Sequence, residues 1–223
     1  MESKIKNAAI ISLLLLLIWI IPTVFLMQQI KPTWTDFDFL TWSSQPDIFY
    51  LTYFIIATLI TIMSVVLFTF IYIYISQMNK CYAVLGMIFI PIYGILNLIG
   101  YSIQISVVPS IATKALSTSE NILFASQLIM SNAFSIIDFI SGLAYFTLGI
   151  PSIIYGYILM KNLKKKSGFS LLISGILHII GIIGYMLQNE ILTAGTFLGV
   201  VVFIIVLVFL IFEFRKKKFF KES

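Results

Sequence analysis

The chain has 223 residues, of which 60% are hydrophobic and 10% carry a charged side chain. A soluble globular domain averages about 45–50% apolar and about 25% charged residues, so this chain has too few polar side chains to cover a surface in water. The composition therefore excludes an ordinary soluble domain and predicts an integral membrane protein.

Apolar runs of membrane-spanning length follow one another along the chain. A spanning helix needs about 20 mostly apolar residues, and six segments satisfy this, at about 8–30, 48–76, 82–109, 134–160, 168–188 and 191–213. The first follows the basic stretch MESKIKN, as in a signal peptide, but it exceeds the usual apolar run of about 7–15 residues and no small-x-small cleavage site follows. We therefore predict one all-α domain over residues 1–223, a membrane bundle of six transmembrane helices.

The basic residues divide unequally between the two ends of these spans. If the N-terminus is cytoplasmic, only Lys31 and Lys114 of the fourteen basic residues fall outside. The twelve on the inner side are Lys4, Lys6, Lys80, Lys161, Lys164, Lys165, Lys166, Arg215, Lys216, Lys217, Lys218 and Lys221. The positive-inside rule then predicts a cell-membrane protein with both termini in the cytoplasm.

The basic clusters KNLKKK and RKKKFFK allow two interpretations. They are typical of contact with anionic lipids of the inner leaflet, and similar clusters also occur in nucleic-acid-binding patches. The loops that carry them are too short to form a separate binding module. We therefore predict lipid contact and no nucleic-acid partner.

Two connections on the predicted outer side are longer than the others. Segment 31–47 holds Trp34 and Trp42 among acidic residues, which is typical of a loop at the membrane interface. Segment 117–133 begins with serine and threonine residues before Glu120, a pattern that starts helices. Its apolar spacing predicts a short amphipathic helix on the outer surface between spans three and four.

Polar side chains recur at helical spacing on spans three, four and five. Seven residues on these faces are our candidates for ligand binding. They are Asn97, Tyr101 and Gln104 on span three, Asp138 and Tyr145 on span four, and His178 and Tyr185 on span five. An amide or imidazole in hydrocarbon needs a polar partner, and a neighbouring helix is the nearest source. We therefore predict that spans three to five face one another around a polar cavity open to the exterior.

A packing seam without a cavity is the alternative interpretation of these faces. The face of span four also carries small residues, Ser135, Gly142, Gly149, Ser152 and Gly156, which allow helices to approach closely. For His178 the favoured interpretation is a hydrogen-bonded core histidine that donates to Asn97 or Asp138. Asp138 lies in the outer leaflet, where a carboxylate costs less than the roughly 2.5–3.5 kcal/mol expected at a helix centre.

Residues that carry chemistry are scarce. The single cysteine, Cys81, excludes an intrachain disulfide, and a small buried side chain is favoured there over palmitoylation. With one histidine, paired haem ligation within the chain is impossible and a metal site is poorly supplied, so we predict no cofactor and no metal. The chain has no H-E-x-x-H, G-x-S-x-G or phosphate-binding glycine loop, and we predict that it is not an enzyme.

The stretch NLIGYSIQISVVPS at 97–110 combines an amide, an aromatic residue, a glutamine and a Val-x-Pro type ending. Matching positions on span four are Ser135, Tyr145 and Gly149. On these residues the region 82–218 resembles a group of uncharacterised six-span prokaryotic membrane proteins. That group has an acid where this chain has Ser141, whereas Asp138 lies one helical turn earlier, so no role passes to Asp138. The resemblance implies the six-span fold and brings no established activity.

These observations predict a multi-pass membrane protein that binds or moves a small molecule or lipid in a polar cavity between spans three, four and five. The alternative is a structural or regulatory membrane subunit whose polar faces only pack helices.

Overall fold

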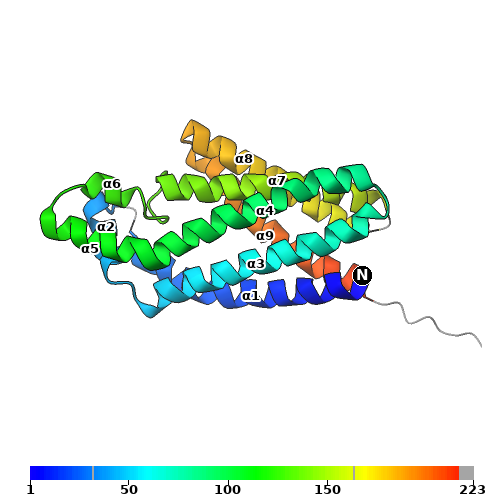
Figure 1. The fold of residues 1–223 in the computed structure, drawn as a ribbon, viewed down its shortest axis with the longest axis horizontal. Helices are drawn as coiled ribbons and strands as arrows, with labels where there is room; N and C mark the ends of the chain where they lie inside the picture. Colours follow the sequence, from blue (N-terminus) through cyan, green and yellow to red (C-terminus); the bar gives the residue numbers. More distant parts are fainter. Residues whose placement is uncertain (32, 163, 216–223) are drawn as a thin grey trace, which may run out of the picture.

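The computed structural model describes residues 1–31, 33–162 and 164–215, and in these ranges it contains helices and no strand. In chain order the helices are α1 (Glu2–Gln29), α2 (Asp36–Ser44), α3 (Ile48–Ser76), α4 (Lys80–Ser102), a π-helical turn η1 (Ile103–Val107), α5 (Val108–Thr118), α6 (Ile122–Ser126), α7 (Ile136–Lys161), α8 (Lys165–Leu187) and α9 (Glu190–Glu213) (Figure 1).

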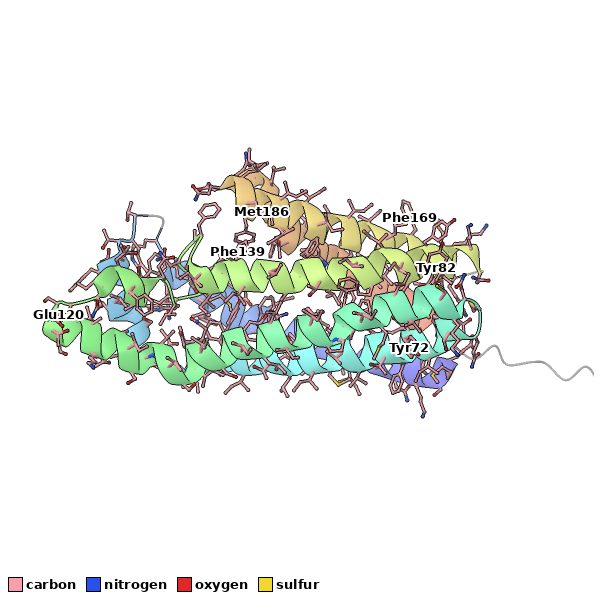
Figure 2. The ribbon with its side chains drawn as sticks, turned by 45° about the horizontal axis from the view of Figure 1, so that its top comes forward. Tyr72, Tyr82, Glu120, Phe139, Phe169 and Met186 are labelled. Atoms are coloured by element: carbon pink, nitrogen blue, oxygen red, sulfur yellow. The ribbon has the colours of Figure 1, made fainter. Side chains whose placement is uncertain are left out.

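Six helices are long and apolar enough to cross a membrane: α1, α3, α4 with its continuation through η1 and α5, α7, α8 and α9. They coincide closely with the six predicted spans, so the prediction of an all-α, multi-pass membrane protein is confirmed. Their outward faces carry large apolar side chains, such as Phe139, Phe169 and Met186 in Figure 2. Lipid is a suitable solvent for such faces, whereas water is not.

The six long helices form a closed ring in the order in which they occur along the chain. Each packs against the next, from α1 through α3, α4, α7 and α8 to α9, and α9 packs back against α1. Short turns join α3 to α4, α7 to α8 and α8 to α9. Residues on the inward faces of all six helices therefore meet at the axis of the ring, whatever their separation in sequence.

Three short helices, α2, α5 and α6, pack together at one end of the ring, and we call them the cap (Figure 1). They share a small hydrophobic core, formed by Phe39, Leu40, Val108, Ala112, Ala115, Ala125 and Ile129. Glu120 lies at the tip of the cap in Figure 2, far from Tyr82 and Phe169 near the other end. The cap thus extends the bundle beyond the ends of the other long helices.

Helix α2 was not predicted from the sequence, where its residues were assigned to an interfacial loop. A capping box starts it: the Thr35 hydroxyl accepts a bond from the Asp38 backbone N–H, and the Asp38 carboxylate accepts one from the Thr35 N–H at 2.8 Å. The bonds from the Thr35 backbone and hydroxyl hold the pKa of Asp38 below its ordinary value. The Thr-x-x-Asp pattern was the available sign of this helix.

Both ends of the described chain lie at the end of the ring opposite the cap. The ammonium group of Lys164 forms an ion pair with Glu2 at 3.4 Å and donates to the backbone carbonyl of Glu213. The Glu213 carboxylate accepts bonds from the backbone N–H groups of Lys166 and Ser167 at 3.1 and 3.2 Å, so it caps the first turn of α8. These contacts join α1, α8 and α9, and we call this the termini end.

Two further details differ from the sequence analysis, and a third lies beyond the described residues. In place of one amphipathic helix over 117–133 there are the end of α5, the five residues of α6 and a series of turns. Cys81 is exposed, so the expectation of a buried cysteine is wrong. Four basic residues lie outside the described residues, namely Lys216, Lys217, Lys218 and Lys221. Their lipid contacts are therefore not tested by the structure.

Candidate functional site

A cavity of about 250 Å³ lies inside the ring near the cap. Its lining residues are Trp19, Tyr53, Phe54, Tyr101, Met130, Ser131, Asp138, Ser141, Tyr145, Tyr185, Thr193, Thr196, Phe197 and Val200. All six long helices contribute to this set, together with the segment that precedes α7. The cavity is therefore not confined to spans three, four and five, because the ring brings α1, α3 and α9 to the same axis.

Asp138 enters the cavity from the first turn of α7. Ser135 is the N-cap of this helix, and its hydroxyl accepts a bond from the Asp138 backbone N–H at 3.1 Å. The Asp138 carboxylate accepts one bond from the Phe134 backbone N–H at 3.1 Å and one from the Tyr185 hydroxyl at 2.9 Å. Within the described residues, no lysine or arginine forms an ion pair with it. The carboxylate is thus half-buried without a cationic partner.

Aromatic side chains form much of the wall around Asp138. The Tyr185 ring packs over Gly142, where a Cβ atom would lie 2.6 Å from the ring, so only glycine leaves room for this tyrosine. Trp19 of α1 and Tyr53 of α3 also line the cavity, and their ring centroids are 4.9 Å apart. Tyr101 and Tyr145 complete this part of the lining. The cavity is therefore a mainly aromatic chamber with one carboxylate.

A second, smaller cavity of about 30 Å³ lies deeper in the ring and shares Trp19, Tyr101 and Tyr145 with the first. His178 borders it, 1% exposed, with its ring 5.3 Å from that of Tyr145. Neither ring nitrogen bonds to any described residue, so the hydrogen-bonded core histidine considered from the sequence is not present. A volume of this size is about that of one water molecule.

Two of the seven candidate residues border neither cavity. Asn97 is fully buried next to Tyr93, and neither its amide nitrogen nor its oxygen bonds to a described residue. Gln104 is fully buried in η1, donates to the Leu128 carbonyl at 2.7 Å and accepts from the Met130 N–H at 3.1 Å. Gln104 therefore holds the segment that covers the cavity and does not reach the cavity itself.

The other five candidates do come together. Tyr101, Asp138, Tyr145 and Tyr185 line the larger cavity, and His178 lines the smaller one. Sequence reasoning missed Trp19, Tyr53 and Phe197 because an isolated aromatic residue in an apolar run is indistinguishable from a lipid-facing one. On α9 the pair Thr193 and Thr196, spaced by three, was the only local sign of an inward polar face.

Small residues bring α7 and α8 into close contact below the cavity, and α8 and α9 into close contact beside it. A Cβ atom on Gly149 would lie 2.9 Å from the Gly175 carbonyl oxygen, and one on Gly156 would lie 2.7 Å from that of Gly168. On the far side of α8, Gly195 approaches the Leu177 carbonyl in the same way, at 2.8 Å. The small residues of span four thus form a packing seam, while the aromatic residues nearer the cap border the cavity.

Comparisons of the chain with protein-family models, with curated proteins and with solved structures find no match. The resemblance noted for residues 82–218 therefore contributes no functional residue to the site. Within the described ranges, no group of three or more histidine, cysteine, aspartate or glutamate residues is placed to hold a metal ion. Function has to be inferred from the geometry of the cavity.

Proposed function

We propose that the protein binds or moves a small molecule in the larger cavity and that it does so without catalysing a reaction. The observation that carries this proposal is a half-buried carboxylate, Asp138, facing a cavity of about 250 Å³ with no cationic partner among the described residues. A charged group inside a membrane bundle is costly and is typically retained where it binds a ligand or an ion. A few polar groups set in an apolar wall are also typical of small-molecule sites.

The proposed orientation places the cap outside the cell and the termini end in the cytoplasm, in the cell membrane. Lys161, Lys164, Lys165 and Lys166 then contact the inner leaflet, where anionic lipids attract basic side chains. The cavity lies near the cap and is reached from the outer side. Apart from the bound small molecule, the only partner in this proposal is membrane lipid. Nucleic acid is not a proposed partner.

Cysteine labelling tests the orientation. In a Cys81→Ser background, Glu120→Cys at the tip of the cap is expected to react with a membrane-impermeant thiol reagent in intact cells. Lys165→Cys, which is also exposed, is expected to react only after the cells are opened. The reason is the concentration of basic residues at the termini end. Reaction of Lys165→Cys in intact cells would mean that the bundle is inserted the other way round.

A structural or regulatory subunit is the second candidate function. The close glycine contacts between α7 and α8 favour it, because a stripe of small residues is sufficient to explain the packing of these helices. This candidate requires that the cavity admits nothing from solution. Accessibility of the cavity therefore separates the two functions.

Ser141→Cys provides this test, again with Cys81→Ser. Ser141 lines the cavity one turn from Asp138. The thiol of Ser141→Cys is therefore expected to react fully in detergent with methyl methanethiosulfonate, a small neutral reagent. Thr147→Cys lies on the same helix, 7% exposed and outside both cavities, and is expected to stay unmodified under these conditions. Mass spectrometry of the intact protein measures both. An unreactive thiol at position 141 would contradict the binding function and leave the structural one.

A further inference from the structure

The charge of the larger cavity is unbalanced. The Asp138 carboxylate accepts one bond on each oxygen, from Tyr185 and from Phe134, whereas a carboxylate has about four acceptor positions. The lining includes no lysine, arginine or histidine. At the termini end, by contrast, Glu2 has Lys164 as an ion-pair partner. A positive charge near Asp138 would therefore have to come from a bound ligand and not from a described side chain.

The walls of the cavity suit a cation that is poorly hydrated. Half of the fourteen lining residues are aromatic, among them Trp19, Tyr53, Tyr101 and Tyr145. The faces of such rings carry partial negative charge and attract ammonium groups, most strongly where water is excluded. An anion would meet the carboxylate and ring faces without a basic side chain to compensate. Charge and lining together favour an organic cation.

The size of the cavity limits that cation. At about 30 Å³ for each water-sized group, a volume of about 250 Å³ holds roughly eight such groups. A trimethylammonium group with a short arm fits, and a complete lipid with acyl chains does not. A groove of about 260 Å³, bordered by Phe134, Ile136 and Phe139, lies on the other side of Tyr185. Tyr185 borders both this groove and the cavity.

We infer that the larger cavity binds an organic ammonium cation of about the size of choline, with Asp138 as its counter-ion and the surrounding aromatic rings as its cage. This inference rests on the proposed binding function and specifies its ligand class. The cation is either a small molecule in solution or the choline headgroup of a lipid. Both present the same chemistry to the cavity.

Two thiol reagents with one reactive group and opposite charges test the inference on Ser141→Cys in the Cys81→Ser background. Rates for the trimethylammonium-ethyl and sulfonato-ethyl methanethiosulfonates are each divided by the rate of that reagent with a free thiol in solution. The cationic reagent is expected to be favoured by about tenfold or more, as in clefts lined by one sign of charge. Asp138→Asn is expected to remove the preference.

Protection experiments on the protein with Asp138 intact identify the source of the cation and do not depend on the folding of Asp138→Asn. Slower modification in detergent with added choline supports a soluble ligand. Slower modification by the neutral reagent in phosphatidylcholine nanodiscs than in phosphatidylglycerol nanodiscs supports a lipid headgroup, because an anionic lipid surface does not concentrate a neutral reagent. Either result supports the inference.

Equal normalised rates for the two reagents would overturn the inference, and so would a charge preference without protection by choline or phosphatidylcholine. The proposed function survives both of these results if the neutral reagent still modifies Ser141→Cys. If the neutral reagent does not modify Ser141→Cys, the proposed binding function itself is contradicted, whatever the class of ligand. The two failures are therefore distinguishable.

Discussion

Replacement of Gln104 by leucine is expected to lower the melting temperature of the protein in detergent by about 5–15 °C. The side chain is fully buried, and its loss leaves the Leu128 carbonyl and the Met130 N–H without their partner. Each buried polar group left without a bond costs about 1–3 kcal/mol. A loss of roughly 2–4 kcal/mol corresponds to this shift for a chain of this length. Thermal unfolding followed by tryptophan fluorescence measures it.

Two variants calibrate the effect of Gln104→Leu. Tyr50→Phe removes only longer contacts, each 3.3 Å, from the Tyr50 hydroxyl to the backbone carbonyl and the side-chain oxygen of Gln104, and is expected to cause a small shift. Gln77→Leu changes an exposed glutamine between α3 and α4 and is expected to cause none. The order Gln104, Tyr50, Gln77 is the expected ranking. A Gln104→Leu protein that melts with the wild type would mean that Gln104 does not hold the segment over the cavity.

Replacement of Gly156 by alanine is expected to lower the melting temperature by about 3–10 °C. The added Cβ atom would lie 2.7 Å from the Gly168 carbonyl oxygen and 2.7 Å from the Leu172 backbone nitrogen. Both are backbone atoms in a helix and do not yield as a side chain does, so α7 and α8 have to separate. Overpacking of this kind costs about 1–3 kcal/mol, which corresponds to the stated shift.

Gly100→Ala is the matched control for Gly156→Ala. A Cβ atom on Gly100 would meet the end of the flexible Met130 side chain at 3.1 Å, which moves aside at little cost. Alanine also favours a helix over glycine by about 1 kcal/mol, so this variant is expected to keep or raise the melting temperature. If both variants melt alike, backbone contact between α7 and α8 is not what holds these helices together.

The packing seam and the cavity lie at different positions along α7 and α8. Near the termini end, pairs such as Gly156 with Gly168 let the α7 and α8 backbones touch. Nearer the cap, the large side chains of Tyr145 and Tyr185 line the cavity. The packing and binding interpretations of the polar faces are therefore compatible, because each describes one part of α7.

Much of the fold is determined by the sequence alone. A spanning helix depends on the length and apolar content of one continuous segment, and both are local properties that can be read without knowledge of the rest of the chain. For this reason the six long helices occur where they were predicted. Helix α2 could also have been found, since the capping box between Thr35 and Asp38 is a local pattern.

The composition of the site was decided by the tertiary structure. Helical spacing shows which residues share a face, but it does not show where that face points once six helices close into a ring. Asn97 and Gln104 share a face with Tyr101, yet only Tyr101 reaches the cavity.

Trp19 and Phe197 are apolar in local context, and they enter the cavity because α1 and α9 pack against each other when the ring closes. Contacts between helices far apart in the chain have no local signature in the residues, and these contacts determine which side chains surround Asp138.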